Sequence, residues 1–298
     1  MKLGTRGSRL ALAQASQVIR ALRQLNNDLD IETVIIQTTG DRGGDTALLG
    51  DGVFVKEIQR QLLEGQIDLA VHSLKDMPTD PVTGLIIAAV TEREDPRDAI
   101  VGTTLDSLRP GARVGTGSPR RSAQFLRLRP DVQVVAIRGN VPTRVEKALS
   151  GEVDAIVVAL AGLNRLGIEA DQVLEAEQML PAPGQGAVAV EARDGEPELA
   201  ALLSKIHHRP TRDAAAAERA VLRRLGGGCL LPVAALATVT SDRLRLEAAV
   251  TSQDGKRQIR HVAEVEHDKP LAASRKVANA LVADGAMQIL EELHGVAP

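Results

Sequence analysis

Short apolar runs alternate with segments of helical periodicity along most of this chain, and this alternation limits the folds open to it. The strand-like runs lie at residues 31–39, 67–71, 85–91, 112–116, 132–137 and 155–160. The helical periodicity lies at residues 54–64, 120–128 and 141–149. Strands that alternate with helices are typical of α/β domains. The fold class is therefore predicted to be α/β.

Two segments are suited to crossings between domains, because both contain proline and neither has the periodicity of a helix or a strand. Residues 92–98 are charged and broken by Pro96, and residues 181–186 read Pro-Ala-Pro-Gly-Gln-Gly before a further strand-like run. A chain that leaves one α/β domain, builds a second and returns makes two lobes around a cleft. The expected divisions are domain 1 from residues 1–94 and 187–206, domain 2 from 97–180, a return hinge at 181–186 and a third domain from 209–298.

The carboxyl-terminal part has a different pattern. Helices are expected at 196–206 and 214–225, strands at 233–239, 244–250 and 259–265, and one long helix at 271–293. This order predicts a smaller C-terminal α+β domain behind the two α/β lobes. The crossing pattern of those lobes resembles that of periplasmic binding proteins.

Arginines are concentrated in the middle of the chain. Residues 109–144 contain eight arginines and one acidic residue, Asp131, for a local net charge of +7, whereas the whole chain has a net charge of −3. That total does not indicate bulk attraction to nucleic acid. The chain also has two Phe and no Trp or Tyr, so it lacks the aromatic surface on which single strands stack. Because arginine binds carboxylates through paired hydrogen bonds, the stretch favours a small polycarboxylate or phosphate.

The chain is expected to act in the cytoplasm, without a membrane or a metal. No run approaches the roughly 20 apolar residues of a membrane span, and the amino terminus lacks the apolar run of a signal peptide. A single cysteine, Cys229, excludes an internal disulfide and a multi-thiolate metal site. The neighbours His207 and His208 do not face one site on a helix, so they do not predict a metal either.

Three motifs carry candidate chemistry. Residues 71–78 read Val-His-Ser-Leu-Lys-Asp-Met-Pro and follow an apolar strand directly. Open α/β sheets bind ligands at such strand ends, although a polar turn closed by Pro78 is the simpler interpretation of this run alone.

The second motif surrounds Cys229, which follows three consecutive glycines. A lone cysteine is more often a small buried apolar residue. The glycines nevertheless let a bulky group approach the backbone, and a loop thiol near arginines ionises readily and becomes nucleophilic.

The third motif is Ser118-Pro119-Arg120-Arg121. Ser118 can cap a helix that opens at Pro119, and the free N–H groups of a helix start help to hold an anion. Arginine in a first helical turn is unfavourable for the helix, which indicates a functional role for Arg120 and Arg121. Neither a dinucleotide fingerprint nor a phosphate-loop lysine pattern occurs, so ATP and NAD are not expected.

Together these motifs resemble those of the porphobilinogen deaminase family, which builds the linear tetrapyrrole of haem biosynthesis. The resemblance spans nearly the whole chain and includes residues 4–8, 54–57, 71–76, 92–99, 138–141, 161–167, 183–187 and 227–229. It implies a transferase with a dipyrromethane cofactor attached covalently to Cys229. On this primer four porphobilinogen molecules are condensed with loss of ammonia, before hydrolysis releases hydroxymethylbilane.

The resemblance also implies roles for individual residues. Asp76 is implied as the catalytic acid/base that stabilises cationic pyrrole and azafulvene species. Besides Cys229, the implied cofactor-binding residues are Lys75, Asp76, Ser118, Arg120, Arg121 and Arg144. The implied substrate-binding residues are Arg6, Ser8, Arg138 and Arg165. Phe54, at the base of the Gly-rich segment 41–53, is expected to lie against a pyrrole ring.

This chain departs from the family pattern at Pro119 and Leu230. Its segment 46–53 is also a few residues shorter than the same segment in many relatives, and it lacks the lysines found there. The expected partner is the small molecule porphobilinogen, with no nucleic acid, and the chain is expected to be a monomer. The main alternative is a non-enzymatic two-lobed anion-binding protein, which would need export and would leave Asp76 and Cys229 without a role. A nucleic-acid-binding protein is the third interpretation.

Overall fold

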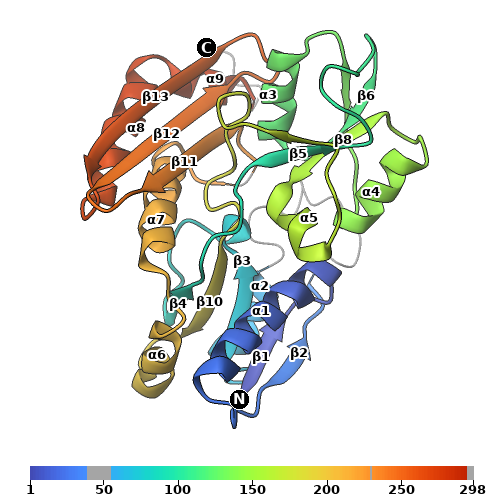
Figure 1. Ribbon diagram of the computed structural model, residues 1–298. Helices are drawn as coiled ribbons and strands as arrows, with labels where there is room; N and C mark the ends of the chain where they lie inside the picture. Colours follow the sequence, from blue (N-terminus) through green and yellow to red (C-terminus); the bar gives the residue numbers. More distant parts are fainter. Residues whose placement is uncertain (39–54, 229, 294–298) are drawn as a thin grey trace. The chain divides into compact units, whose positions relative to one another are not determined.

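A computed structural model describes residues 1–38, 55–228 and 230–293 of the chain (Figure 1). These residues divide into two compact units. The first contains Met1–Glu94 and Ala187–Arg212, and the second contains Asp95–Gly186 and Asp213–Pro298. The predicted division into three domains with a hinge at 181–186 is finer than this and stays a prediction.

The first unit is built on a mixed sheet with the strand order β2-β1-β3-β10-β4. Its strands are β1 (Lys2–Thr5), β2 (Glu32–Ile35), β3 (Leu69–Ser73), β4 (Leu85–Val90) and β10 (Val188–Arg193). Its helices are α1 (Arg9–Leu25), α2 (Lys56–Leu63) and α6 (Pro197–Ser204). Strand β1 pairs parallel with β2 and β3, whereas β10 pairs antiparallel with both β3 and β4.

Helices cover both faces of this sheet. Successive residues of β3 point to opposite faces, so its side chains contact a different helix on each face. Leu69 and Val71 of β3 pack in one apolar cluster with Val18 of α1. Ala70 points the other way and packs with Ile58 of α2. This explains why β3 begins with three consecutive apolar residues rather than with an alternating pattern.

The second unit contains a mixed sheet with the strand order β7-β6-β8-β5-β9. Its strands are β5 (Asp98–Val101), β6 (Arg113–Gly115), β7 (Gln133–Val135), β8 (Ala155–Ala159) and β9 (Gln172–Leu174). Its helices are α3 (Pro119–Leu128), α4 (Val141–Leu149) and α5 (Leu160–Leu166). Phe125 of α3 is fully buried in one apolar cluster of this unit, and Val145 of α4 packs in another.

The carboxyl-terminal segment adds the antiparallel sheet β11-β12-β13. Its elements are α7 (Arg209–Arg224), β11 (Val233–Val239), β12 (Arg243–Thr251), β13 (Gln258–Glu266), α8 (Pro270–Ala283) and α9 (Ala286–Glu292). Residues of α7, α8, α9 and the sheet share one apolar cluster, which includes Val221, Leu246, Val277 and Leu290. The predicted α+β character of this segment is confirmed.

Several details of the predicted secondary structure were wrong or incomplete. The long helix expected at 271–293 is broken between α8 and α9. Gly285 lies there with a φ of 93°, which a right-handed helix cannot contain. Helices α1 and α5 and the short strands β5 and β9 were not predicted from the sequence. The expected crossing at 92–98 is too long by one residue, because Asp98 begins β5 and is fully buried. No helix among the described residues is both long and apolar enough to cross a membrane.

Candidate active site

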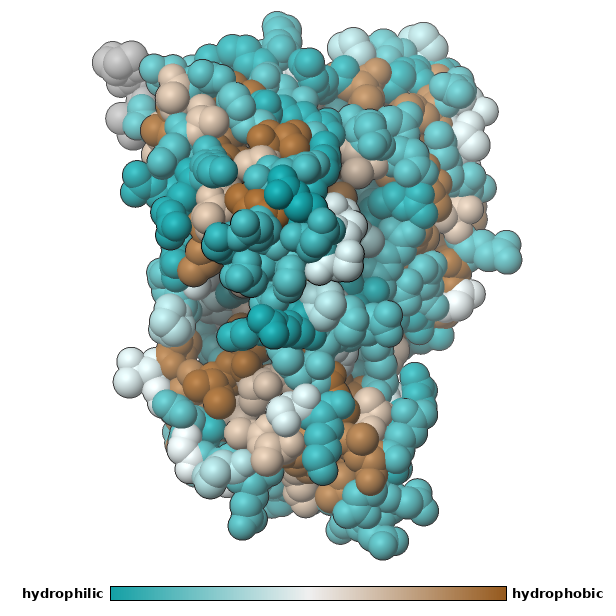
Figure 2. Space-filling view, turned by 60° about the vertical axis from the view of Figure 1, so that its left-hand side comes forward, coloured by the Kyte–Doolittle hydropathy of each residue, from teal (hydrophilic) through white to brown (hydrophobic). Residues whose placement is uncertain are grey.

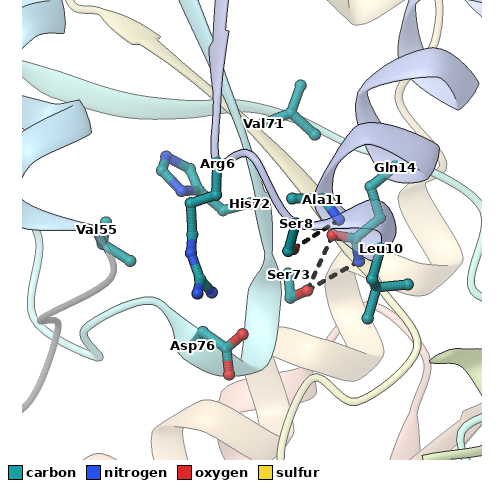
Figure 3. A pocket seen from close by; sticks show the side chains of 10 residues that line it. All are labelled: Arg6, Ser8, Leu10, Ala11, Gln14, Val55, Val71, His72, Ser73 and Asp76. Carbon is teal, nitrogen blue, oxygen red and sulfur yellow. Dashed lines mark hydrogen bonds between the residues drawn. The ribbon is translucent and has the colours of Figure 1, made fainter. Parts of the chain in front are cut away.

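A small cavity of about 70 Å³ lies at the carboxyl ends of β1 and β3 in the first unit (Figure 3). Its lining residues are Arg6, Ser8, Leu10, Ala11, Gln14, Val55, Val71, His72, Ser73 and Asp76. Strands β1 and β3 are parallel neighbours, with Leu3 opposite Leu69. Because their carboxyl ends meet at one edge of the sheet, residues far apart in the sequence converge there.

Ser8 fixes the start of α1 at this cavity. Its side-chain hydroxyl accepts a hydrogen bond of 3.2 Å from the backbone N–H of Ala11, as expected of a helix N-cap. This cap turns the chain from β1 into α1 directly after Arg6. Arg6 and Ser8, two of the predicted substrate-binding residues, therefore line the same cavity as Asp76.

Asp76 lies at the end of a short 3-10 turn, Leu74–Asp76, that follows β3. The backbone N–H of Leu74 donates a 3.0 Å hydrogen bond to the carbonyl of Ala187, which holds this turn against the segment that leads into β10. The Asp76 carboxylate and the Arg6 guanidinium point toward one another in Figure 3. An acid and a cation thus share one small, partly enclosed space. Lys75 lies half-buried in the same turn but is not among the lining residues.

Gln14 and Ser73 form a polar pair in the cavity wall. Gln14 Nε2 donates to Ser73 Oγ at 2.8 Å, and Ser73 Oγ lies 3.1 Å from Gln14 Oε1 (Figure 3). This pair was not predicted, because α1 was not predicted. The signal available was Ser8, a good N-cap, followed by the strong helix formers of residues 9–15.

A second group of predicted residues gathers in the second unit, around the start of α3. Ser118 caps this helix and accepts from the backbone N–H of Arg121 at 3.4 Å. Arg120 Nη1 donates to Asp98 Oδ2 at 2.6 Å and to the carbonyl of Leu180, also at 2.6 Å. Arg121 Nε donates to Asp98 Oδ1 at 2.9 Å.

Gln185 completes this buried network. Its amide nitrogen donates to Asp98 Oδ1 at 2.9 Å and to the carbonyl of Pro96 at 2.7 Å, and its amide oxygen accepts from Arg121 Nη2 at 3.2 Å. The Pro-Gly-Gln-Gly segment, expected only to form a return hinge, therefore also anchors an arginine. Asp98 and Gln185 were missed as site residues, because their partners are more than twenty positions away in the sequence.

The electrostatics of this group favour a bound anion. Burial alone would raise the pKa of Asp98, but the charges of Arg120 and Arg121 and the hydrogen bonds from Arg120 and Gln185 outweigh burial and lower that pKa to about 2. Burial lowers the pKa of Arg144, and the nearby positive charge of Arg121 lowers it further. Arg144 Nε donates to the carbonyl of Gly139 at 2.7 Å, and within the described parts of the chain no carboxylate pairs with this guanidinium. One buried carboxylate thus pairs with two arginines, and Arg144 adds a third positive charge near Arg121.

The remaining predicted site residues are distributed as follows. Arg120 is 3% exposed and held by protein groups, so its role as a cofactor ligand stays a prediction. Arg138 is exposed beyond β7. Arg165 Nη2 donates to the carbonyl of Gly186 at 2.8 Å. Cys229 and Phe54 lie outside the described residues, as does the segment 41–53.

Family models cover most of the chain. Residues 1–201 match the model described as porphobilinogen deaminase, dipyromethane cofactor binding domain, and residues 213–283 match porphobilinogen deaminase, C-terminal domain. A porphobilinogen deaminase of Moorella thermoacetica is 47% identical over 98% of this chain and 96% of its own length. Its counterpart from Desulforamulus reducens is 44% identical over 98% of this chain and 97% of its own length.

Similar solved structures are more distant. A putative methionine-binding lipoprotein of Bacillus subtilis is 11% identical, with a TM-score of 0.44 over 72% of this chain and 92% of its own. A periplasmic VFT2 domain of Bordetella pertussis BvgS is 16% identical, with a TM-score of 0.42 over 69% of this chain and 86% of its own. These likenesses are too distant to bear on activity. The family models and the full-length relatives, by contrast, agree with each other and with the motifs, and by them the chain belongs to the porphobilinogen deaminase family.

Proposed function

We propose a division of labour between the two groups of residues for the formation of hydroxymethylbilane. The cavity of the first unit handles the proton and the amino group of porphobilinogen. The arginines at the start of α3 and in α4 bind carboxylates. The observation that carries the proposal is the cavity that brings Asp76 together with Arg6, because it supplies an acid and a carboxylate-binding cation in one place.

The described residues suit a dipyrromethane cofactor. Two porphobilinogen units bring two acetates and two propionates, and guanidinium groups are the best bidentate partners for such anions. Arg121, Arg144 and the hydroxyl of Ser118 would hold these carboxylates, since Arg144 is buried enough for its pKa to fall and has no carboxylate partner among the described residues. When bound, the dipyrromethane supplies the pyrrole carbon at which the chain grows. Its attachment to Cys229 is part of the proposal.

Asp76 moves the protons of the reaction. In each condensation the carbon–nitrogen bond of the porphobilinogen aminomethyl group would break with loss of ammonia, and formation of the new carbon–carbon bond would release one proton. The Asp76 carboxylate stabilises the positive charge that develops on the substrate ring and accepts the proton at an Oδ atom. Arg6 orients the substrate through one of its carboxylates. Four such condensations and a final hydrolysis give the product.

Intact mass measurements test the covalent part of this proposal. The purified protein is expected to carry the mass of two deaminated porphobilinogen units, and addition of porphobilinogen should produce heavier species by further units. Cys229→Ser should show the bare chain and no turnover. A wild-type protein that turns over porphobilinogen as a bare chain would contradict the proposal.

The same measurement tests the arginines. Arg144→Leu should carry less of the adduct than the wild type, because a cofactor carboxylate would lose its partner. Arg109→Leu is the matched control, since the Arg109 side chain is 78% exposed and pairs with Asp154. Equal adduct in both variants would show that Arg144 does not hold the cofactor.

A monomeric state and a cytoplasmic location complete the proposal. Both rest on the sequence, and sedimentation equilibrium of the holoenzyme tests the first.

A further inference from the structure

A buried network of polar side chains lies behind the wall of the Asp76 cavity. His72 of β3, Glu191 of β10 and Gln59 of α2 are 5%, 3% and 6% exposed. Gln59 Nε2 donates to Glu191 Oε1 at 2.8 Å, and His72 Nε2 lies 3.3 Å from Glu191 Oε2. Neither His72 Nε2 nor Glu191 Oε2 makes a well-aligned hydrogen bond with any described residue. Each of these two atoms is therefore the hydrogen-bond partner that the other needs.

The position of Glu191 in the sheet is unusual for a carboxylate. Strand β10 lies between β3 and β4, so Glu191 occupies the interior of the sheet. The pairing of β10 with β4 shifts register between Val190 and Glu191. Such irregularities often redirect a side chain near a functional site. A buried charge is also costly unless it is paired, which argues against an incidental glutamate here.

One end of this network lines the cavity, and the other end is bonded to a lining residue. His72 lines the cavity directly. Gln59 lies one helical turn beyond Val55, a second lining residue, and the backbone N–H of Gln59 donates to the Val55 carbonyl at 2.9 Å. These side-chain contacts thus connect the start of α2 to β3 through Glu191. In a cavity of about 70 Å³, rotation of one imidazole ring would change the space available to a ligand.

The proton arrangement follows from the donors. Glu191 accepts a hydrogen bond from the amide N–H of Gln59 at Oε1. Its other oxygen then needs a donor, and the only donor that His72 can offer at this place is a proton on Nε2. The second interaction therefore fixes the tautomer and the orientation of the ring.

We propose that Glu191 is a positioning residue of the active site: it holds His72 with Nε2 protonated in the cavity wall, and Gln59 holds Glu191 in turn. This inference deepens the proposed function and rests on it, because it assigns the cavity to porphobilinogen. None of the three residues is assigned a part in the chemical step.

Nitrogen-detected NMR of histidine-labelled holoenzyme tests the chain of contacts without turnover. The protein has six histidines, and His72→Gln assigns the His72 signals by their loss. In the wild type, Nε2 of His72 should be protonated. Glu191→Leu should remove that preference. Glu32→Leu, the same substitution at an exposed glutamate of β2 in the same unit, should preserve it.

Steady-state kinetics tests the link to the site. Glu191→Leu should lower kcat/KM per holoenzyme molecule by about tenfold, the lower end of the 10–100-fold that outer hydrogen-bond partners cost in metal sites. Glu191→Gln can still accept from Nε2–H and should recover most of this loss. Gln59→Leu should show a smaller loss and serves if Glu191→Leu does not fold. Adduct mass and thermal unfolding, measured on the same samples, separate misfolding from mispositioning.

The outcomes are distinct. A wild-type His72 with a bare Nε2 overturns the inference, and so does a Glu191→Leu holoenzyme with wild-type kcat and KM. If the wild-type protein does not turn over porphobilinogen, the proposed function fails, while the NMR result still decides whether Glu191 holds His72.

Discussion

At the scale of single residues, Asp76 and Asp98 are two aspartates with opposite surroundings. Asp76 is half-buried in a cavity with Arg6 and has access to a ligand. Asp98 is fully buried and bound by Arg120, Arg121 and Gln185, so its hydrogen-bonding capacity is used within the protein. The first aspartate suits chemistry, and the second suits the placement of arginines.

We expect Asp76→Asn to lower kcat by about 10²–10⁴-fold, the usual contribution of a positioned acid/base group. The amide keeps the size of the side chain but neither carries the negative charge nor accepts a proton. Asp80→Asn, at an exposed aspartate four residues further on, is the control and should have wild-type kcat. Steady-state assays of both holoenzymes decide this, and an unchanged kcat in Asp76→Asn would place the acid/base group elsewhere.

Asp98 should make stability depend on acid pH. Its pKa is about 2 in the folded protein against an ordinary value of 3.8, so its stabilising contribution is present above pH 4 and is lost as pH falls toward 2. The size is about 2 kcal/mol, from 1.36 kcal/mol per pKa unit. Asp98→Asn should lack this dependence between pH 4 and 2. It should also be less stable at pH 7 by about 3–5 kcal/mol, because two buried arginines lose their carboxylate.

Denaturant unfolding of both proteins at several pH values measures this difference. If the two proteins lose stability in parallel between pH 4 and 2, another group carries the acid sensitivity.

At the scale of elements, close packing rather than pattern decides several details. Gly255, in the turn between β12 and β13, has a φ of 73°, and a Cβ there would lie 2.5 Å from the backbone nitrogen of Arg127 in α3. Only glycine lets this hairpin approach the helix backbone so closely. No single-sequence pattern records that contact, because its two sides are over a hundred residues apart.

Gly255→Ala should therefore destabilise the protein by more than a left-handed alanine alone would. Gly151→Ala is the matched control, since Gly151 has a φ of 78° but open space around it. The control should cost about 1–2 kcal/mol for the backbone conformation, and Gly255→Ala should exceed it by about 1–3 kcal/mol for the overlap with α3. Equal free energies of unfolding for the two variants would show that the hairpin can move aside.

The sequence was most informative where local chemistry decides the structure. Ser118 and Pro119 predict the start of α3, and the apolar run before His72 predicts β3, because caps and buried strands have local signatures. The break at Gly285 was missed, since a glycine within a helical pattern is often tolerated. The Gln59–Glu191 pair was beyond reach, because its two residues are 132 positions apart and meet only through the topology of the sheet.

The candidate site shows the same division. Arg6, Ser8 and Asp76 belong to short motifs and were predicted, and they do line one cavity. Gln14 lies outside those motifs, and Asp98 belongs to the motif at 92–99 but was given no role there. Only the folded chain connects these two residues to the site.

At the scale of the whole molecule, the two units are connected in an unusual order. Strands β4 and β10 pair directly, and the backbone N–H of Thr91 donates to the Val188 carbonyl at 3.0 Å. Antiparallel neighbours can be joined by a short hairpin loop, but here the loop is the whole segment Asp95–Gly186. This segment is therefore an insertion into a hairpin of the first unit.

We expect a shortened chain, with a short Gly/Ser loop in place of Asp95–Gly186 and an end at Arg212, to fold cooperatively. The fragment Met1–Glu94 should not fold, because it lacks the strand between β3 and β4. Circular dichroism and urea unfolding of the two proteins test this. Cooperative unfolding of Met1–Glu94 would show that β10 is dispensable.

The insertion also has a consequence for synthesis on the ribosome. Roughly 100 residues separate β4 from β10, and at about 5–20 residues per second the ribosome needs about 5–20 s to make them. Throughout that interval β3 and β4 have exposed edges that can pair with other nascent chains. The time during which the nascent chain is most prone to aggregate is thus set by the length of the segment that interrupts its sheet. A pause in translation within that segment would prolong this time.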